Sequence, residues 1–586
     1  MFKIVKKIRI LLDKKQKRTM LFLVLMMFIG ALLETASLGA LIPVIQTIMK
    51  ENAIAESGTL TALYNGLGCT SEKQFTVYIM LAVIVLFAIK NVYLYWQQKC
   101  TLRFVYGNQF DTSERMMKSY LRKGYEFYLN ADTAVVQRNI TSDVNNMYGL
   151  ILALLTLISE CIVFVCLVAV CFFSDAVLTL LIAGILCLLL VVIEKVLKPI
   201  MRKAGEDNQN FYSGLFKWIS QTVQGIKEVK VTGKEKYFVD EYVKCGHGYV
   251  NAVQKYSLYN NIPRLLIEVV CIGSLLGYII FMILVQGVEP KDMSNSLTAL
   301  AAVALRLLPC VNRINNQINN ISYFEPFLMG VNDTLQDDID NTNTDMSFAA
   351  EEEKLPVHKV IRLEDITYSY PGTDKLIFDH ADLKIPIGAA VGVVGTSGAG
   401  KSTVVDILLG LLVPKTGTIY ADNVNVMEHY RGWLKNIGYI PQMIFMLDDT
   451  IRKNVAFGVP EEEIDEKRVW EVLKEAQLDE FIRSLPDGLN TGIGERGIRL
   501  SGGQRQRIGI ARALYNDPEV LILDEATSAL DNDTEAAIMD SINRLHGKKT
   551  LLIIAHRLQT IEKCDIVYRV ENGKARIERG QLADID

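Results

Sequence analysis

Long apolar segments in the first half of the chain place the strongest constraint on its fold. The chain has 586 residues, half of them hydrophobic, and the apolar residues concentrate before about residue 310. A helix needs ~20 mostly apolar residues to cross the hydrocarbon core of a bilayer. The segments that meet or approach this length are residues 20–48, 75–98, 147–173, 176–198, 262–286 and 294–310. The first half is therefore predicted to be an α-helical membrane domain with six spans.

The charges between these spans indicate which side of the membrane each segment occupies. The long segments after the second and fourth spans are basic, whereas the loops 50–74, 173–175 and 287–293 are short or nearly neutral. Basic loops are retained on the cytoplasmic side, so both termini and the two long loops are expected there. The long loops keep a helical pattern, which predicts that spans 2 to 5 continue well beyond the membrane. We also expect a short external helix within residues 53–67.

The two ends of the membrane domain have distinct compositions. Phe2–Leu12 is basic and amphipathic, which predicts a helix on the cytoplasmic membrane surface. Residues 331–354 are acidic and polar, which indicates a linker. From residue 355 to residue 586, strand-like runs alternate with helical ones, which predicts an α/β domain with a mostly parallel sheet. The expected domains are therefore a membrane domain at 1–330, a linker at 331–354 and an α/β domain at 355–586.

Residues 395–402 form a complete P-loop, which follows a predicted strand at Ala390–Val394 and precedes a predicted helix. Such a loop rings phosphates with backbone N–H groups, and the following helix points its positive end at them. Lys401 would reach the β- and γ-phosphates, and the Ser402 hydroxyl would ligate Mg²⁺. The predicted nucleotide-binding residues of this segment are Gly395, Thr396, Ser397, Gly398, Ala399, Gly400, Lys401, Ser402 and Thr403. The motif predicts a P-loop NTPase that uses ATP and Mg²⁺, without saying what the hydrolysis drives.

Two carboxylates follow another predicted strand, Val520–Leu523. Asp524 is expected to support Mg²⁺, and Glu525, one residue further on, could polarise the attacking water. An isolated Asp-Glu pair would more simply be two solvated carboxylates at a strand end. The P-loop upstream favours the catalytic interpretation, in which Glu525 acts as a general base.

A second phosphate-binding segment is predicted at Ser501, Gly502, Gly503 and Gln504. These residues directly precede the predicted helix Arg505–Leu514. The P-loop already holds the γ-phosphate of one ATP, so a second such segment suggests ATP held between two copies of the domain. With Leu-Ser-Gly-Gly-Gln between the P-loop and Asp-Glu, the chain resembles the ATP-binding cassette (ABC) transporters. The resemblance covers essentially the whole chain and is to the exporter type, in which one membrane domain precedes one cassette.

This resemblance implies roles for further residues. Tyr370 matches the aromatic side chain that stacks on adenine, and Gln442 matches the glutamine that contacts Mg²⁺ and water. Asp531 matches the loop that crosses the dimer interface, and His556 the histidine that contacts the γ-phosphate. Gly494–Gly497 resembles the exporter segment that touches the intracellular loops. The catalytic set would thus be Glu525, His556 and Gln442, with Ser402, Gln442 and Asp524 at the metal.

The same resemblance implies contacts between the membrane domain and the cassettes. Gln224–Lys230 resembles the second coupling helix, which docks on a cassette, and the first coupling segment is expected near Asn130–Val136. Exporters built from two unequal chains often carry one degraded catalytic site. The intact set here therefore favours a homodimer, and a heterodimer stays open.

Cations within the predicted spans bear on the cargo, because charges in a bilayer are costly and usually face a cavity or a partner. At 1.5 Å per residue, Arg306 lies ~18 Å into the sixth span and Lys90 ~22 Å into the second. Arg264 and Arg313 lie near the inner ends of the fifth and sixth spans. We expect these four residues to line a cationic cavity for an anionic headgroup.

Carboxylates in the same spans allow a second explanation. The counter-charges are Glu34 in the first span, Glu160 in the third and Glu268 in the fifth. Glu34 could pair with Lys90, or Glu268 with Arg264, and such a pair would serve structure alone. Ala304–Ile314, however, resembles the sixth span of bacterial flippases for lipid-linked oligosaccharides, whose cargo carries a pyrophosphate. That resemblance implies ATP-driven movement of a polyprenyl-pyrophosphate-linked glycan across the plasma (inner) membrane.

Other functions remain as alternatives. An exporter of drugs, other lipids or peptides would use the same cassette mechanism. A non-transporting ATPase with paired cassettes, such as a repair or translation factor, would lack the six spans. The formal net charge of -4 argues against a nucleic-acid partner. The expected partners are a second copy of the chain, the lipid bilayer and an amphipathic cargo.

Overall fold

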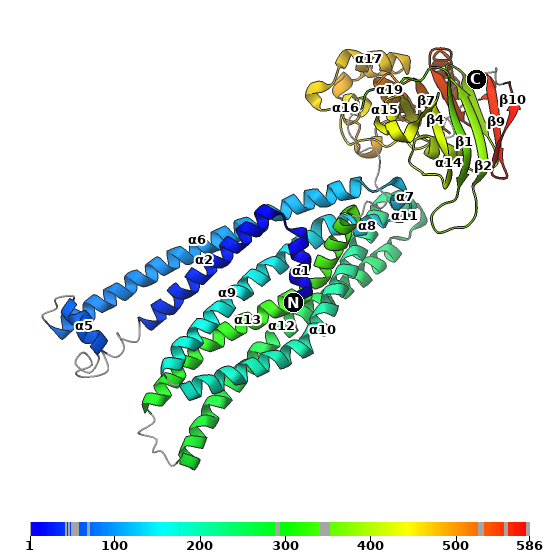
Figure 1. Cartoon of the computed structure of the whole chain (residues 1–586). Helices are drawn as coiled ribbons and strands as arrows, with labels where there is room; N and C mark the ends of the chain where they lie inside the picture. The colour runs from blue at the N-terminus through cyan, green and yellow to red at the C-terminus, as the bar shows by residue number, and fades with distance from the viewer. Residues whose placement is uncertain are drawn as a thin grey trace. The chain divides into compact units, whose positions relative to one another are not determined.

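The computed structural model describes residues 2–40, 44, 47, 58–66, 71–174, 176–286, 294–339, 352–525, 532–555 and 561–581. The chain divides into two compact units (Figure 1). The helical unit comprises Met1–Leu121 and Ala131–Thr342, and the cassette unit comprises Arg122–Asn130 and Asn343–Asp586. The short segment Arg122–Asn130 thus leaves the helical unit, although it lies within the predicted membrane domain 1–330.

The helical unit is built from long helices that run side by side (Figure 1). Its helices are α1 (Phe2–Leu11), α2 (Lys14–Gly39), α5 (Gly58–Gly66), α6 (Glu72–Leu121), α8 (Thr133–Arg138), the π-helical turn η1 (Asn139–Asp143), α9 (Val144–Ser174), α10 (Ala176–Gln224), α11 (Ile226–Thr232), α12 (Glu235–Gln286) and α13 (Ser294–Ile339). Helix α12 has 52 residues, which makes it ~78 Å long. This is more than twice the ~30 Å hydrocarbon core, so the predicted continuation of the helices beyond the membrane is confirmed.

Among the residues that the structure describes, four segments are long and apolar enough to cross a membrane: Lys14–Ser37, Glu72–Leu121, Thr133–Ala169 and Glu235–Leu284. They contain or overlap the predicted spans 1, 2, 3 and 5. The first predicted span, 20–48, runs past the end of α2 at Gly39. The predicted spans 4 and 6 begin helices α10 and α13, where the structure leaves several side chains undescribed, so the number six stays a prediction.

The amphipathic N-terminal helix packs on protein. Ile4 and Ile8 of α1 are buried, and the helix contacts α13. The ammonium of Lys7 lies 3.3 Å from a carboxylate oxygen of Asp333 in α13. The predicted helix is therefore confirmed, but its apolar face is covered by neighbouring helices and is not free to enter lipid. An apolar stripe cannot by itself distinguish a protein partner from a lipid one.

The linker begins later than predicted. Helix α13 continues to Ile339, within the predicted linker 331–354. Val331 and Leu335 lie one helical turn apart and are buried, and this packing overrides the acidic, polar composition of the segment. Of the external helix predicted within 53–67, the structure describes α5 over Gly58–Gly66, and its Tyr64 ring packs edge-on against Phe75 at 5.3 Å.

The cassette unit contains two sheets. The larger has the order β10-β9-β3-β8-β7-β6, in which every neighbouring pair except β10 and β9 is parallel. Its strands are β3 (Ala390–Val394), β6 (Ile437–Ile440), β7 (Val520–Asp524), β8 (Thr550–Ile554), β9 (Ile566–Glu571) and β10 (Lys574–Arg579). The predicted parallel sheet is therefore confirmed. The second sheet is antiparallel, with the order β2-β1-β4-β5, and was not predicted.

The remaining elements of the cassette unit surround these sheets. The strands of the second sheet are β1 (Val360–Tyr368), β2 (Phe378–Pro386), β4 (Thr416–Ala421) and β5 (Val424–Asn425). The helices are α7 (Tyr125–Asn130), α14 (Lys401–Leu408), α15 (Tyr430–Leu434), α16 (Ile451–Val455), α17 (Glu466–Glu475), α18 (Asp479–Ser484), α19 (Gly502–Tyr515) and α20 (Asn532–Asn543), with short 3-10 turns at Val426–His429, Glu461–Glu463, Gly488–Asn490 and Glu495–Gly497.

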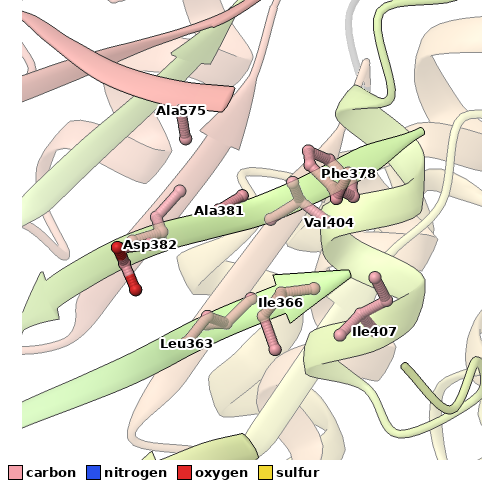
Figure 2. A pocket seen from close by; sticks show the side chains of 9 residues that line it. Leu363, Ile366, Phe378, Ala381, Asp382, Val404, Ile407 and Ala575 are labelled. Carbon is pink, nitrogen blue, oxygen red and sulfur yellow. The ribbon is translucent and has the colours of Figure 1, made fainter. Parts of the chain in front are cut away.

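The helix that follows the P-loop is held by the antiparallel sheet. Figure 2 shows Leu363 and Ile366 of β1 and Phe378 of β2 around the same small pocket as Val404 and Ile407 of α14. All five side chains are buried, and the small pocket between them is apolar. This contact is therefore part of the core that fixes α14, and it is separate from the nucleotide-binding face.

Candidate functional site: a nucleotide site at one edge of the parallel sheet

The predicted nucleotide-binding residues follow strands that end at the same edge of the larger sheet. The register pairs Ile440 of β6 with Leu523 of β7, and Asp524 with Ile554 of β8. Parallel strands bring their carboxyl ends together, and ligands of open α/β sheets bind at that edge. The P-loop follows β3 and Gln442 follows β6, so the sequence order of these motifs folds into one site.

The P-loop adopts a conformation that requires glycine. Gly398 and Gly400 have φ angles of 78° and 105°, in the left-handed region. A Cβ at Gly400 would lie 2.7 Å from Cγ2 of Ile377. The ammonium of Lys401 donates to the carbonyl oxygens of Gly395 and Thr396, both at 3.2 Å. The loop thus folds around its own lysine, which is 5% exposed and held where phosphate oxygens would replace these carbonyls.

Two of the three residues predicted at the metal, Ser402 and Asp524, lie in contact. The Ser402 hydroxyl donates to Oδ1 of Asp524 at 3.2 Å. Asp406 lies one helical turn after Ser402 on α14; burial, and then the charge of Asp524, raise its pKa to about 6. Two carboxylates and a hydroxyl are hard oxygen donors, which suit Mg²⁺. Within the described ranges no cluster of three His, Cys, Asp or Glu residues could hold a metal alone. These residues fit Mg²⁺ when nucleotide phosphates complete its ligands.

Gln442 and Glu525 contact each other directly. The Gln442 side-chain amide donates to Oε2 of Glu525 at 2.9 Å. Glu525 has a φ angle of 49°, which is uncommon for a residue other than glycine and is found at functional sites more often than elsewhere. The sequence predicted both residues separately from their motifs. The structure adds that the amide orients the carboxylate, as a base that activates water requires.

Tyr370 lies beside the P-loop helix. Its hydroxyl is 3.0 Å from the hydroxyl of Thr403, and its ring packs edge-on against Tyr368 at 5.4 Å. Tyr370 is half-buried, so part of the ring is accessible to a base. The predicted adenine-stacking residue is thus next to the predicted phosphate-binding helix, and Thr403 acts here as its hydrogen-bond partner.

The segment that joins the cassette unit from the helical region is α7, which the sequence did not place correctly. Glu126 of α7 accepts a hydrogen bond from the Tyr368 hydroxyl at 3.3 Å. Burial, followed by the charge of Asp406, raises the pKa of the Tyr125 hydroxyl. The first coupling segment was expected near Asn130–Val136, but Asp132 caps a new helix there by accepting from the Ala134 amide at 3.0 Å. Gly124, directly before α7, is the signal that could have located it.

The residues Ser501, Gly502, Gly503 and Gln504, called here the signature segment, form a capped helix start. The Ser501 hydroxyl accepts from the Gln504 amide at 3.2 Å, and the Gln504 side chain accepts from the Ser501 amide at 2.8 Å. This reciprocal pair is a capping box. Ser501 and Gly502 are exposed at the first turn of α19, and Gly503 follows them in that turn. Asp531 and His556, the two other predicted nucleotide contacts, lie outside the described residues.

The cations predicted in the membrane domain have different surroundings. The Lys90 ammonium lies 4.6 Å from the centre of the Phe87 ring, and Arg264 is exposed. The structure describes both of these side chains and their suggested partners Glu34 and Glu268, and neither suggested ion pair forms. Arg306 lies within α13, and its side chain is outside what the structure describes.

Among the three of these cations whose side chains the structure describes, Arg313 has an ion pair, with one of the carboxylates expected as counter-charges. Its Nε lies 2.7 Å from Oε1 of Glu160 in α9, and the thiol of Cys310 donates to the Glu160 backbone carbonyl at 3.3 Å. The side chain of Arg313 is 48% exposed and that of Glu160 15%. The structure thus leaves Arg313 accessible while giving it an intramolecular counter-ion.

Comparisons with known proteins agree with this architecture. A family model described as ABC transporter transmembrane region matches residues 20–305, and one described as ABC transporter matches residues 378–528. The ATP-dependent lipid A-core flippase of Shewanella frigidimarina is 29% identical over 532 residues, 88% of this chain and 85% of the flippase. ABC transporter B family member 29, chloroplastic, of Arabidopsis thaliana is 28% identical over 93% of this chain and 85% of its own length.

The fold is also similar to a solved structure. The structure of a bacterial Atm1-family ABC exporter with ATP bound has a TM-score of 0.76, covers 96% of this chain and 95% of its own, and is 20% identical in sequence. This likeness supports the exporter fold, and the two family models supply a membrane region fused ahead of a cassette. The chain therefore belongs to the ABC transporters, as an exporter-type half-transporter that hydrolyses ATP to drive transport across a membrane.

Proposed function

We propose that two copies of the chain form one transporter that flips or exports an anionic, lipid-linked amphiphile. The exposed signature segment supports the dimer. Ser501 and Gly502 form a phosphate-binding helix start on the cassette surface, apart in sequence from the P-loop that carries Lys401. Each ATP would lie between Lys401 of one copy and Ser501 of the other. A heterodimer with a related chain would use the same arrangement.

Apolar surfaces in both units also favour association between copies. Val231 of α11 is 80% exposed, and an apolar groove runs beside it along the ends of α10 and α12. In the cassette unit, Met443 and Ile498 are 87% and 79% exposed. A contiguous apolar surface such as this groove is typical of an interaction site. The match of Gln224–Lys230 to the second coupling helix supports docking of α11 on a cassette.

The chain's own residues have distinct roles in the proposed cycle. Lys401 and the P-loop backbone bind the phosphates, and Tyr370 positions the base. Glu525, oriented by Gln442, accepts the proton of the attacking water. Ser402, Asp524 and Gln442 would hold Mg²⁺, which neutralises phosphate charge. Closure of the two cassettes would draw the membrane helices together, and hydrolysis supported by Glu525 and His556 would reopen them.

Two accessible cations, near the inner ends of the fifth and sixth predicted spans, carry the proposal for the cargo. Arg264 is exposed and Arg313 is half-exposed, although both belong to long apolar helices. A guanidinium in such a place suits a phosphate group, which it can bind through two parallel hydrogen bonds. We expect Lys90 and Arg306 to contribute to the same cavity. Several curated relatives are named lipid A-core flippases, which supports a lipid-linked cargo.

Within that class, a polyprenyl-pyrophosphate-linked oligosaccharide is the proposed cargo. The segment Ala304–Ile314 resembles the sixth span of flippases for such lipids. The proposed site of action is the plasma (inner) membrane, with both termini and the cassette on the cytoplasmic side. The basic segments after spans 2 and 4 support this orientation.

Reconstituted vesicles test this proposal. The chain is incorporated with a labelled polyprenyl-pyrophosphate glycan, and ATP-dependent translocation is measured for Arg306→Ala, Arg313→Ala and the parent. We expect both substitutions to reduce translocation strongly, whereas Lys236→Ala, at an exposed lysine of α12 well before the fifth predicted span at 262–286, should not. Intact translocation in both arginine variants would rule out the cationic cavity. Transport of a neutral drug or peptide instead would support the alternative exporter.

A further inference from the structure

A buried ion pair lies next to the π-helical turn of the helical unit. Arg138 ends α8, and Asp143 ends the turn Asn139–Asp143. The Arg138 Nε lies 3.2 Å from Oδ2 of Asp143, and the two residues are 8% and 0% exposed. Turns of this kind are rare and occur frequently at functional sites. The pair is therefore unusual in both its burial and its backbone.

The guanidinium of Arg138 also binds helix α10. Its Nη1 donates to the Ser213 hydroxyl at 2.6 Å and to the Gln209 carbonyl at 3.2 Å. The Gln209 side-chain amide in turn donates to Oδ2 of Asp143 at 2.7 Å. The ion pair and α10 are thus joined by three hydrogen bonds, and each of the two charges has at least one partner on α10.

Helices α6 and α13 meet the same pair. Asn139 accepts from Nη2 of Arg138 at 2.9 Å and donates to the Tyr120 hydroxyl of α6 at 2.7 Å. That hydroxyl is 3.4 Å from the hydroxyl of Thr334 in α13. Gly330 of α13 approaches so closely that a Cβ there would lie 3.1 Å from Oδ2 of Asp143. One polar network therefore connects four helices.

The polar network contains residues on both sides of the segment Arg122–Asn130 in the sequence. Between Tyr120 and Arg138 the chain leaves the helical unit, because Arg122–Asn130 belongs to the cassette unit, where Glu126 binds Tyr368. The hydrogen bond from Asn139 to Tyr120 ties together the two points at which the chain departs and returns. A displacement of α7 must therefore act on the network, and through it on α10 and α13.

Stability alone does not account for such a pair. Burying two charges costs desolvation energy that their attraction often fails to recover, and an apolar pair of similar size is frequently as stable. Oδ1 of Asp143 has no hydrogen-bond partner in the described part of the chain, so the carboxylate is incompletely satisfied. An unused buried acceptor leaves the pair able to adopt a second arrangement when the surrounding helices move.

We propose that Arg138 and Asp143 are positioning residues for ATP-driven transport, which transmit movement of the segment Arg122–Asn130 to helices α10 and α13. They touch neither nucleotide nor cargo in this scheme. Their role is to couple the residues that flank this segment on either side to helices α10 and α13, so that both move together. The inference depends on the family's ATP-driven transport and on the contacts around Arg138 and Asp143, and it holds for any cargo.

Hydrogen–deuterium exchange of the full chain tests this without knowledge of the cargo. In a Glu525→Gln background, ATP with Mg²⁺ should change deuterium uptake both in P-loop peptides and in peptides of α10 and α13. In the double variant Arg138→Met, Asp143→Leu, the P-loop response should persist and the α10 and α13 response should be lost. A folded double variant that keeps the α10 and α13 response overturns the proposal.

Two further variants control for misfolding and for general ion-pair effects. Lys217→Ala removes an exposed pair with Asp132, at 3.6 Å, between the same two segments, and should leave both responses unchanged. Arg138→Lys keeps the charge, but an ammonium group cannot reproduce the two hydrogen bonds that the guanidinium donates to Ser213 and Asn139. It should weaken the α10 and α13 response selectively. If the double variant does not fold, a full response in Arg138→Lys contradicts the inference and a selective loss supports it.

Discussion

The two units use their charged residues differently. In the cassette unit, Lys401 binds carbonyl groups of its own loop, and Asp524 lies beside Ser402 at the edge of the sheet. These are groups that a phosphate or a cation can engage in place of their present partners. In the helical unit, the buried charges Arg138 and Asp143 bind each other, and their further partners Gln209 and Ser213 are distant in sequence. The arrangement in the cassette unit suits ligand binding. The arrangement in the helical unit suits coupling the movement of one helix to that of another.

The largest effect should come from the cassette residue with the most direct chemical role. Glu525→Gln removes the base while leaving the P-loop untouched, so ATP hydrolysis should fall by ~10²–10⁴-fold and ATP binding should persist. Steady-state phosphate release and filter binding of labelled ATP measure the two quantities. The matched control is Glu519→Gln, which changes a carboxylate just before β7 that pairs with Lys354 at 3.0 Å. Brisk hydrolysis by Glu525→Gln would remove the catalytic assignment.

The second effect tests whether the P-loop shape or merely its glycine content is required. Gly400→Ala would force a φ of 105° on alanine and place its Cβ 2.7 Å from Ile377. Backbone strain of this kind costs roughly 1–3 kcal/mol, and the collision adds to it. Gly458→Ala is the control, because Gly458 also has a positive φ, 79°, but no atom within 4 Å of the added Cβ. Thermal unfolding should report a loss in both variants, with the larger loss in Gly400→Ala, which alone should weaken ATP binding.

The sequence predicted the cassette far better than the helical unit, for a physical reason. Strand ends at one edge of a parallel sheet bring Lys401, Gln442 and Asp524 together whatever the details of packing. Long helices contact each other through side chains whose angular position depends on small differences in helix register. The pairing of Arg313 with Glu160, or of Arg138 with Asp143 across a π-helical turn, could therefore not be inferred from spacing. The antiparallel sheet was missed because its strands carry no motif.

A third effect tests whether burying the Asp406 carboxylate lowers the stability of the fold. The pKa of Asp406 is raised from 3.8 to about 6, chiefly by burial, so its charged form destabilises the fold. The penalty is nearly absent below pH ~3.5, accumulates as the pH rises from ~4 to ~6 and is complete above that. After a discount for solvent screening, Asp406→Asn should gain about 1–2 kcal/mol at pH 8 and little at pH ~3.5. Thermal unfolding without nucleotide or Mg²⁺ measures this difference, and an equal gain at both pH values would contradict it.

The smallest effect concerns whether the helical unit holds Arg313 firmly. The pair with Glu160 is short at 2.7 Å, yet Arg313 is 48% exposed, so solvent weakens the attraction. A double-mutant cycle with Glu160→Gln and Arg313→Gln should give a coupling of ~0.2–1 kcal/mol, as for other accessible pairs. A coupling well above that range would make the pair a structural one, closer in kind to Arg138 with Asp143. A small value leaves Arg313 able to exchange Glu160 for an anionic headgroup at little cost, which the proposed cargo requires.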